Sequence, residues 1–527
     1  MMGSQTSPHL AKKTTLTSTS TSTVTATSAA MAPSPLDLFL LTFNCAKNLI
    51  NVGVFASHLY GALSQNATGT AGAALPDLVA LSLQEVAPLS YSFIGSYFLN
   101  PYYARYEEAL NLASARLLET KALESSDASD ALPRPTPRPY TLVRAKNVGM
   151  TAILLFARDP THIHKIEEAE CGFGAADMGN KGAVGLRVTW SDAPNGATTP
   201  ATEVTLVATH LAAMEWNLKK RNANWLTIVS GLTFANPLAI LPGPFPPDTS
   251  APRPDQSGAG DTRPPSSSSS SDETTHPLLP SPAPALSETD LAALQSASIF
   301  KPTSHLFVFG DLNYRISTST PPPLAAFPSF DPSSPDYYPS FLPRDQLTQE
   351  RLARRAFHGL AEAPVAFGPT YKFDVLPDSA LDEADNVEAV RAGAQHNGVA
   401  EVPWRFAPHR WPGWCDRVLF LEEGVEVRGY EALPVVRTSD HRAVYLRAAV
   451  VPLGEEGAVS GRGEEDPRVK MPVAVDLHAW ERRRAARQRE LVVGWTAFWW
   501  STKEGAVVMA TVMVVVVGGW WLWGLGG

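Results

Sequence analysis

The stretch FVFGDLNYRI, Phe307–Ile316, places several polar side chains directly after a short apolar run. The apolar residues predict a buried strand, and Gly310 is expected to end it. Asp311, Asn313 and Arg315 then follow on a turn, so a carboxylate, an amide and a guanidinium leave one strand end together. A rigid strand that delivers polar groups to its carboxyl edge can build an active site, although the same residues could also simply cap the strand.

The same pattern, an apolar strand that ends on polar residues, recurs along the chain. Further strands are predicted at Leu36–Asn48, Pro76–Val86, Thr151–Arg158, Lys181–Trp190, Glu203–Ala213, Asp416–Glu422 and Ser439–Val450. Helices are expected at Ala104–Lys121, near Glu215–Ser230 and at Asp345–Leu360. Because strands far outnumber βαβ alternations, a core of two mixed or antiparallel sheets with flanking helices fits better than a Rossmann fold.

The composition excludes some classes of protein. The net charge of −9 argues against a broad basic face that grips nucleic acid, but it leaves room for a local basic pocket. A hydrophobic content of 44% is sufficient for a sizeable core. The three cysteines, Cys45, Cys171 and Cys415, are too few and too scattered for a disulfide framework or a zinc cluster, which indicates a reducing compartment.

Segments of biased composition suggest the domain boundaries. Residues 1–34, rich in Ser, Thr and Ala, predict a disordered tail. The core domain is expected at 35–450, and two Pro/Ser-rich insertions at 237–290 and 318–343 are predicted to be flexible because they cannot bury a core. Residues 451–479 have the composition of a polar linker.

The C-terminus combines a basic segment with an uncharged one. Residues 480–504 include WERRRAARQRE, which predicts a basic helix, and residues 505–527 contain no charged side chain and no polar face. As a helix, residues 505–527 would extend about 34 Å, which matches a bilayer core of about 30 Å. A buried core helix is the alternative. We expect a transmembrane tail anchor whose preceding arginines lie in the cytosol.

The polar residues at the predicted strand ends form a set that suits phosphate ester hydrolysis. The set comprises Asn44, Glu85, His210, Asp311, Asn313, Asp416, Asp440 and His441. An Asp can orient and deprotonate a water, and His or Asn can donate hydrogen bonds to a phosphate. A hard divalent cation held by Glu85 and oxygen donors such as Asn44 would be Mg²⁺ rather than zinc, because the sequence has no Cys/His cluster.

A series of short motifs occurs in a fixed order along the chain. They are TFNCAKN, LSLQEV, GNKGAVGLR, ATHLAA with downstream RNANW, GDLNYRI, PTYKFD, WCDRVLF and TSDHRAVY. Together they resemble the inositol polyphosphate 5-phosphatases, within the exonuclease–endonuclease–phosphatase superfamily. The match covers about Leu36–Val450 apart from the insertions. The resemblance implies the superfamily's α/β fold, a four-layer sandwich of two mixed β-sheets flanked by helices.

The resemblance also implies roles for the strand-end residues. The Mg²⁺ ligands would be Glu85, Asn44 and Asp440, and the catalytic residues would be Asp311, Asn313, His441, His210 and Asp416. Asp311 would position and activate the water, and Asn313 would donate to the phosphate in the transition state. His441 would contact the scissile phosphate, oriented by Asp416, with His210 as a second donor. Three alternatives stay open. Asp416 could pair with Arg417 as a structural ion pair, His210 could be a core histidine, and Asn44 could simply form a turn at the strand end.

The substrate-binding residues implied by the resemblance are Tyr371, Lys372, Arg410, Asn180 and Lys181. In the family, residues matching Tyr371, Lys372 and Arg410 hold the 4-phosphate beside the scissile 5-phosphate. A lysine is usual two residues before the arginine, where this chain has Pro408, so the 4-phosphate clamp is expected to be weaker.

A tethered active site would favour a lipid substrate, because tethering raises the effective concentration of headgroups. We therefore expect cleavage of phosphatidylinositol 4,5-bisphosphate to phosphatidylinositol 4-phosphate, with the bilayer as a partner and no nucleic acid. The C-terminal span resembles that of tail-anchored fungal family members, which implies the endoplasmic reticulum membrane with the catalytic domain facing the cytosol. The alternatives are an endonuclease or sphingomyelinase-type phosphodiesterase, and a non-catalytic, membrane-tethered phosphoinositide-binding scaffold.

Overall fold

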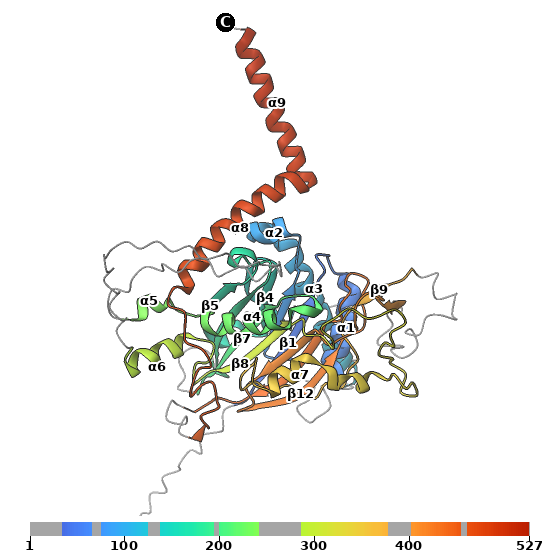
Figure 1. Cartoon of the computed structure of the whole chain (residues 1–527), viewed down its shortest axis with the longest axis vertical. Helices are drawn as coiled ribbons and strands as arrows, with labels where there is room; N and C mark the ends of the chain where they lie inside the picture. Colours follow the sequence, from blue (N-terminus) through green and yellow to red (C-terminus); the bar gives the residue numbers. More distant parts are fainter. Residues whose placement is uncertain are drawn as a thin grey trace, which may run out of the picture.

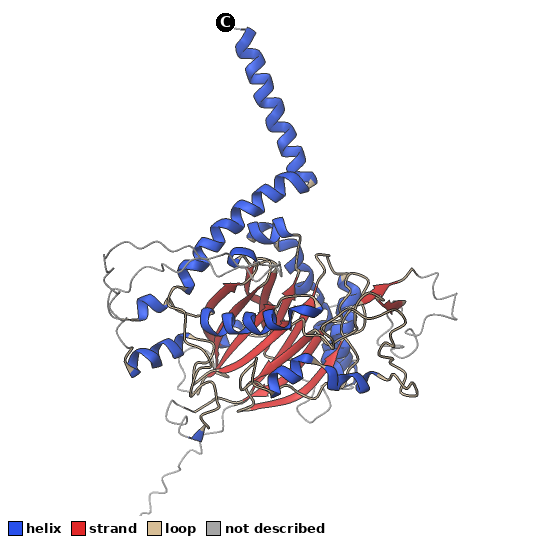
Figure 2. Cartoon of the chain, viewed as in Figure 1, coloured by secondary structure: helices blue, strands red, loops and turns tan. Residues whose placement is uncertain are grey.

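The computed structural model describes residues 34–65, 75–124, 138–193, 200–241, 286–377, 402–454 and 461–525 of the 527-residue chain. Nearly all of the predicted N-terminal tail and most of the first predicted insertion lie outside the described residues. The described part forms a body of two sheets with helices around it, from which one long helix projects (Figures 1 and 2).

The first sheet has six strands in the order β12-β13-β1-β2-β4-β3. Its strands are β1 (Leu36–Asn44), β2 (Leu78–Gln84), β3 (Thr141–Val148), β4 (Thr151–Ala157), β12 (Val425–Ala432) and β13 (Val444–Val450). Strands β1 and β2 are parallel, and all the other neighbours in this sheet are antiparallel. The sheet is therefore mixed.

The second sheet has five strands in the order β11-β8-β7-β6-β5. Its strands are β5 (Ile163–Gly172), β6 (Gly182–Trp190), β7 (Thr202–His210), β8 (His305–Asp311) and β11 (Asp416–Phe420). Strands β7 and β8 are parallel, and the other neighbours are antiparallel. Each sheet thus contains one parallel pair near its centre, and these two pairs carry most of the polar strand ends that the sequence singled out.

The molecule is built in four layers around three apolar cores. The sheets face each other across a core to which both contribute, with Leu206 among its fully buried side chains. The outer face of the first sheet packs against α1 (Val52–Gln65) and α3 (Asn100–Glu124). The outer face of the second packs against α4 (Leu218–Gly231) and α7 (Gln346–Leu352). The central strands read as continuous apolar runs because both of their faces are buried, and the predicted sandwich is confirmed.

The prediction that Gly310 ends its strand is wrong. Strand β8 continues through Gly310 to Asp311, and Gly310 pairs with Thr209 on one side and Arg417 on the other. A Cβ atom at Gly310 would lie 1.9 Å from the carbonyl oxygen of Thr209. The glycine therefore permits close approach of two central strands, and the strand carries Asp311 at its end.

The predicted helix Asp345–Leu360 is also too long, because α7 ends at Leu352. Beyond it the backbone turns repeatedly, with φ values of 56° at Arg354 and 52° at Phe357. These turns bury the Phe357 ring against Trp225, with the two rings stacked 4.5 Å apart. Tertiary packing of one aromatic side chain thus overrides the helical pattern of the segment.

The second predicted insertion, 318–343, differs from its prediction as a flexible segment. Its Phe330 packs against Trp404 and Phe406, which belong to a short antiparallel ribbon of β9 (Phe373–Val375) and β10 (Trp404–Phe406). Aromatic burial therefore fixes this proline-rich segment on the domain. The remaining short elements are α2 (Leu89–Ile94), α5 (Pro237–Ile240), α6 (Glu288–Ala297), η1 (Ser96–Phe98), η2 (Pro160–His162), η3 (Ala175–Asp177), η4 (Glu215–Asn217) and η5 (Tyr338–Arg344).

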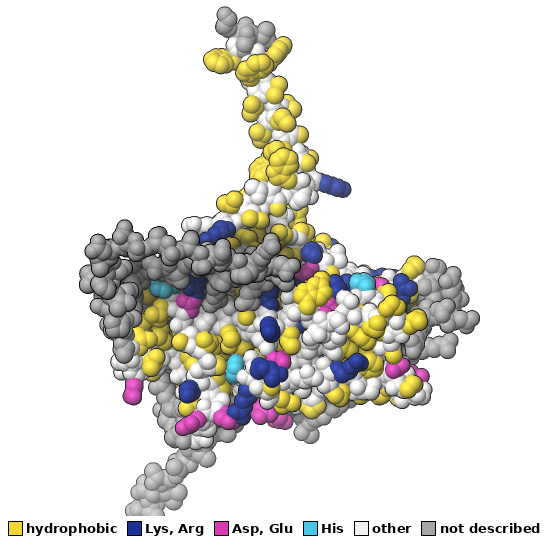
Figure 3. Space-filling model, in the orientation of Figure 1, with side chains coloured by type: hydrophobic (Ala, Val, Ile, Leu, Met, Phe, Trp, Pro, Cys, Tyr) yellow, Lys and Arg dark blue, Asp and Glu magenta, His cyan; other side chains and the backbone are white. Residues whose placement is uncertain are grey.

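The C-terminal region forms two long helices, α8 (Ala479–Ser501) and α9 (Lys503–Leu525). The described part of the predicted linker before α8 contacts the core domain, because Arg468 donates to Glu423 at 2.7 Å. Among the described residues, one helix is long and apolar enough to cross a membrane by length and composition, Lys503–Trp521, with 6% of its apolar window buried. Figure 3 shows hydrophobic side chains along this projecting helix.

Candidate active site

The polar strand ends come together because each parallel pair aligns two carboxyl ends. In the first sheet Asn44 lies beside Gln84, so Glu85 follows at the same edge. In the second sheet His210 lies beside Asp311. The crevice outside the carboxyl ends of such strands is where open α/β folds bind ligands. The two sheets are joined at this edge, since Nδ2 of Asn44 donates to Oδ2 of Asp311 at 3.0 Å.

Asp311 is the centre of the site and is 1% exposed. Its Oδ2 also accepts from Nε2 of His210 at 3.2 Å and lies 3.9 Å from Nε2 of His441. Burial alone would raise the pKa of Asp311, but His441, His210 and Lys181 outweigh it and hold this pKa well below its usual range. The carboxylate is therefore ionised at neutral pH.

His441 is tied to a second buried carboxylate. Its Nδ1 lies 2.8 Å from Oδ2 of Asp416, which also accepts from Oγ1 of Thr370 at 2.7 Å. Burial opposes protonation of His441, but Asp416 and Asp311 raise its pKa to about 9. Burial raises the pKa of Asp416 to about 6, so this carboxyl group is mostly ionised at neutral pH and above. With Nδ1 bound to Asp416, the proton on Nε2 faces Asp311.

Lys181 and His210 form a contact on the other side of Asp311. The Lys181 amine touches the His210 ring, and burial lowers the pKa of Lys181 to about 8. Burial, together with the Lys181 charge, also lowers the pKa of His210. His210 is 1% exposed, yet it contacts Asp311 and Lys181, so it is part of the site rather than a histidine enclosed by apolar side chains.

Arg315 stabilises the turn after β8. Its Nε donates to the carbonyl oxygen of Asn313 at 3.1 Å, and a second guanidinium nitrogen donates to the Asn313 side chain. The guanidinium also lies 4.2 Å from the centre of the Tyr371 ring. Asn313 has a φ of 57° and donates from Nδ2 to the carbonyl oxygen of Leu211 at 3.2 Å. Arg315 therefore fixes the position of Asn313.

The predicted metal ligands Glu85 and Asn44 each contact a neighbouring residue. Glu85 has a φ of 46° and pairs with Lys47 at 2.8 Å. Burial would raise the pKa of Glu85, but His210 and Lys47 lower it below its usual value. Oδ1 of Asn44 accepts from the Ala46 N–H at 3.1 Å, and its second lone pair can take a further partner. The Glu85 carboxylate and the Asn44 amide oxygen suit a hard divalent cation such as Mg²⁺.

Asp440, the third predicted metal ligand, forms an ion pair of its own. Its Oδ2 accepts from Nζ of Lys372 at 2.5 Å, so one of the expected phosphate-binding groups is bound to one of the expected metal ligands. Among the described residues, the cluster of potential ligand atoms within 4.8 Å of one another is instead Asp311, Asp416 and His441. A cation there would face the protonated His441, so the Glu85 edge is the better cation site.

The expected substrate groups are divided between the two sides of Asp311, with Tyr371 beside His441 and Lys181 beside His210. The Tyr371 ring centre is 4.6 Å from that of His441. The Asn180 side-chain oxygen is buried and has no hydrogen-bond partner among the described residues. Arg410 instead donates to Glu215 at 2.9 Å, and Glu215 is fully buried. The sequence reasoning missed Glu215, because no motif marks it.

The alternative pairing of Asp416 with Arg417 does not occur, because neighbouring residues on strand β11 point to opposite faces. Nε of Arg417 donates to Glu362 at 2.5 Å, and its Nη1 donates to Asp345 at 3.0 Å. Arg417 thus forms a separate buried ion-pair network, and Asp416 is left to contact His441 and Thr370. Thr370 was not predicted, although it lies within the PTYKFD motif.

Comparison with known families places residues 41–447 in the Endonuclease/Exonuclease/phosphatase family 2. The chain belongs to this family. The match covers both sheets and every residue of the predicted site, and it confirms the resemblance found in the motifs. It ends before α8 and α9.

Several curated relatives in this family are inositol phosphatases. The chain is 25% identical over 312 residues to inositol-1,4,5-trisphosphate 5-phosphatase 1 of Schizosaccharomyces pombe, covering 58% of this chain and 19% of the relative. It is 28% identical over 357 residues to type I inositol polyphosphate 5-phosphatase 13 of Arabidopsis thaliana, covering 63% and 26%. It is 24% identical over 373 residues to polyphosphatidylinositol phosphatase INP53 of Saccharomyces cerevisiae, covering 70% and 23%.

The matched region thus spans about a quarter or less of these relatives' length. Among solved structures, the chain is similar to the inositol polyphosphate 5-phosphatase domain of SpSynaptojanin in complex with inositol (1,4)-bisphosphate and calcium ion. That similarity covers 87% of this chain and 90% of the other, with 19% identity and a TM-score of 0.46.

Proposed function

We propose that this chain is a Mg²⁺-dependent phosphomonoesterase that removes the 5-phosphate of phosphatidylinositol 4,5-bisphosphate at a membrane surface. The products are phosphatidylinositol 4-phosphate and inorganic phosphate. The observation that carries the proposal is the buried network of Asp311, His441 and Asp416 at the edge where both parallel strand pairs end. Family membership and the phosphatases among the relatives support it.

Asp311 orients the attacking water in this proposal. Its carboxylate is ionised and its two neighbours, Asn44 and His210, hold it in one position. The water oxygen forms a bond to phosphorus as the bond from phosphorus to the inositol oxygen breaks. The water gives up one proton and the inositol oxygen takes one up, so the lipid is left with a hydroxyl group. A fixed base that orients the water contributes mainly through geometry, since no reorganisation is needed at the moment of reaction.

His441, Lys181 and Asn313 act on the charge of the phosphate. His441 is protonated up to about pH 9 and offers its Nε2 proton, since Nδ1 is bound to Asp416. Lys181 adds a buried amine on the opposite side that binds the phosphate in the bound substrate and in the transition state alike, and Asn313 offers an amide without adding charge. Phosphoryl transfer depends on such neutralisation of the equatorial oxygens.

Glu85 and Asn44 would hold the Mg²⁺ ion in this proposal. When bound, the cation supplies positive charge that stabilises the phosphate oxygens. Asp440 joins this set only where substrate draws Lys372 away from it, because the two side chains now form an ion pair. Lys372 would then be free to contact the 4-phosphate beside Tyr371, with Arg410 contributing less because it is bound to Glu215.

The lipid substrate and the membrane location rest on the C-terminal helices. Helix α9 has no charged side chain after Glu504, and exposed Tyr97, Trp495 and Trp500 lie near its base on η1 and α8. Aromatic side chains of this kind favour the membrane–water interface. We propose a cytosol-facing catalytic domain anchored by α9. The endoplasmic reticulum stays a prediction from the resemblance.

Release of inorganic phosphate from a short-chain phosphatidylinositol 4,5-bisphosphate tests the proposal. We expect release with Mg²⁺, none after chelation with EDTA, and recovery when Mg²⁺ is restored. An endonuclease or sphingomyelinase-type phosphodiesterase would leave this substrate intact and cleave a nucleic acid or sphingomyelin instead. A binding scaffold would retain the lipid without releasing phosphate. Either of these results with folded protein would contradict the proposed function.

A further inference from the structure

Helix α8 lies outside the family match, yet it packs against the region that carries the proposed site. It runs alongside α2, and Nη1 of Arg487 donates to the carbonyl oxygen of Phe93 at 2.6 Å (Figure 1). Near its start, the Trp480 indole donates to Oγ1 of Thr233 at 3.0 Å. The segment was predicted to be a basic juxtamembrane helix, and these contacts, together with the packing of Phe498 against Phe98, show that it is part of the folded body.

Glu490 is the most deeply buried charged side chain of α8, with no exposed surface. Its Oε1 accepts from the backbone N–H of Gly179 at 2.8 Å, across 311 residues of sequence. Arg483 donates to both carboxylate oxygens at 2.5 and 2.9 Å, and Arg487 lies 3.3 Å from Oε2. A buried carboxylate is tolerated only when paired in this way.

Gly179 lies in the loop that carries Asn180 and Lys181. Its carbonyl oxygen accepts from the N–H of Met150 at 3.1 Å, and the Met150 carbonyl accepts from Val86, which follows Glu85, at 3.2 Å. A Cβ atom on Gly179 would lie 2.7 Å from the backbone nitrogen of Gly149. The loop therefore lies between α8 and the strand end that carries Glu85, with its backbone close to that of Gly149.

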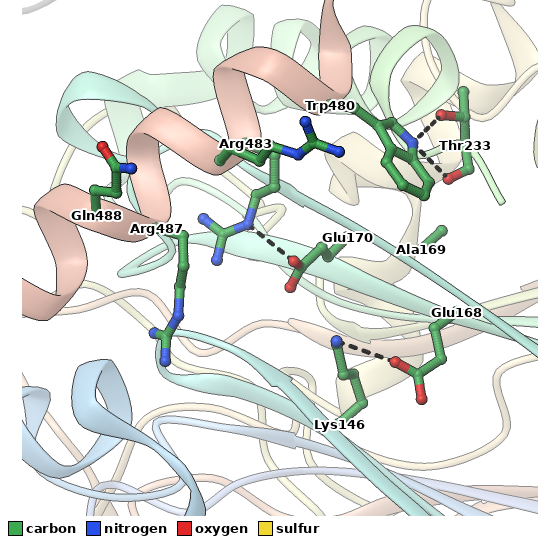
Figure 4. Close-up of a pocket in the computed structure, with 10 residues that line it drawn as sticks. Lys146, Glu168, Ala169, Glu170, Thr233, Trp480, Arg483, Arg487 and Gln488 are labelled. Atoms are coloured by element: carbon green, nitrogen blue, oxygen red, sulfur yellow. Dashed lines mark hydrogen bonds and ion pairs between the residues drawn. The ribbon is translucent and has the colours of Figure 1, made fainter. Parts of the chain in front are cut away.

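The contact lies within a buried face that runs along α8 from Ala479 to Phe498. Figure 4 shows that Arg483 and Arg487 reach from α8 toward the sheet across a cavity lined by Lys146, Glu168 and Glu170. This cavity has a volume of about 550 Å³. On either side of this cavity, α8 contacts the body through Trp480 near its start and through two residues near the loop. These are Glu490 and Arg489, whose Nη1 donates to the carbonyl oxygen of Ala176 at 3.2 Å.

We propose that Glu490 is a positioning residue for the proposed 5-phosphatase reaction. From the helix that precedes the candidate membrane span, it holds the Gly179 N–H and so places Asn180 and Lys181 for the substrate. The buried Glu490 carboxylate then couples the anchor segment to the active site. This inference rests on the proposed function, because the loop matters for catalysis only if Asn180 and Lys181 meet the substrate.

The test uses the full-length chain in detergent with three variants. Glu490→Ala removes the acceptor and leaves Arg483 unpaired. The double variant Arg483→Met/Glu490→Met removes the acceptor and the unpaired charge together, so it guards against simple misfolding. Glu170→Gln is the matched control, since Glu170 lies 3.6 Å from Nε of Arg483 but makes no contact with Gly179.

Two readouts separate the inference from the proposed function. In hydrogen exchange, we expect the Gly179 amide to exchange at least about tenfold faster in both Glu490 variants and unchanged in Glu170→Gln. With short-chain phosphatidylinositol 4,5-bisphosphate, we expect KM to rise about tenfold in the same two variants while kcat changes less than about threefold.

Three results would overturn the inference. They are an unchanged Gly179 amide in the double variant, a faster amide with unchanged KM, and an equal rise of KM in Glu170→Gln. An inactive wild-type chain would overturn the proposed function and, with it, the catalytic role of the loop. In that case the exchange data alone would decide whether Glu490 holds the loop in place.

Discussion

Asp311 keeps its charge in a position that is 1% exposed, because polar and cationic side chains surround it. His210 and Asn44 contact one of its oxygens, and the N–H of Asn313 donates to the other at 3.0 Å. Burying a carboxylate inside a protein costs free energy, and folding alone does not require a carboxylate at such a position. Such polar networks are typical of functional sites.

We predict that Asp311→Asn lowers kcat at least about 100-fold, the usual scale for loss of a positioned base. The amide has the same shape and leaves the strand pairing of β8 intact, so the far-UV circular dichroism should be unchanged. Phosphate release under saturating lipid measures the effect. Activity within a few-fold of wild type would show that Asp311 does not act on the water.

The His441–Asp416 pair makes stability depend on pH. The pKa of His441 rises from its ordinary 6.5 to about 9 in the folded chain. Its contribution to stability is therefore fully present below pH 6.5 and is lost as the pH rises through about 9. We predict that the melting temperature of wild type falls more steeply between pH 6.5 and 9 than that of Asp416→Asn. Parallel curves would contradict this linkage.

At the scale of the elements, the central strands decide where the site lies. Strands β7 and β8 are parallel and end together, which places His210 beside Asp311. Their close approach depends on Gly310, whose Cα faces the Thr209 backbone. Strand pairing and site geometry therefore depend on the same glycine.

We predict that Gly310→Ala destabilises the chain by at least about 2 kcal/mol, because overpacking forces the backbone to move. Gly463→Ala is the matched control, since no atom would lie within 4 Å of its new Cβ. Urea unfolding followed by tryptophan fluorescence gives both values. Equal stability of the two variants would show that β7 and β8 can separate without cost.

Sequence patterns predicted the strands that are fully buried and missed several strands that are half-exposed. Strands such as β1 and β8 are buried on both faces and appear as continuous apolar runs. Strands β3, β5 and β12 lie at sheet edges and mix charged with apolar residues, so no run marks them. A local sequence pattern does not identify a half-exposed edge strand, because such a strand is stabilised by its neighbour in the sheet.

The same distinction applies to the site. Asp311, His210 and Asn44 could be named from the sequence because each ends a recognisable strand. Glu490 could not, since its partner Gly179 is 311 residues away and α8 resembles an ordinary basic helix. Long-range contacts between segments of different composition leave no local signal, and only the folded chain brings them together.

At the scale of the whole molecule, the two C-terminal helices have different relations to the body. Helix α8 contributes buried Arg483 and Glu490 to contacts with the sheet side, whereas α9 projects away (Figure 1). The boundary between the domain and the proposed anchor therefore lies near Thr502, between the two helices. A polar break between a packed helix and an apolar one suits the surface of a bilayer.

We predict that removal of residues 505–527 releases the protein from membranes and leaves hydrolysis of a soluble short-chain lipid within about twofold of wild type. Removal of residues 479–527 deletes Glu490 as well, and we expect KM to rise about tenfold or more. Membrane fractionation and phosphate release check both truncations. A shorter chain that stays in the membrane fraction would contradict the anchor.

Phosphate release across a panel of phosphoinositides that differ at the 3-, 4- and 5-positions tests the central claim most directly. The lipid products are identified with Mg²⁺ present, for wild type and for Asp311→Asn. We predict that wild type converts phosphatidylinositol 4,5-bisphosphate to phosphatidylinositol 4-phosphate, leaves lipids without a 5-phosphate unchanged, and loses this activity in Asp311→Asn. Loss of the 4-phosphate, or no phosphate release from any 5-phosphorylated lipid, would contradict it.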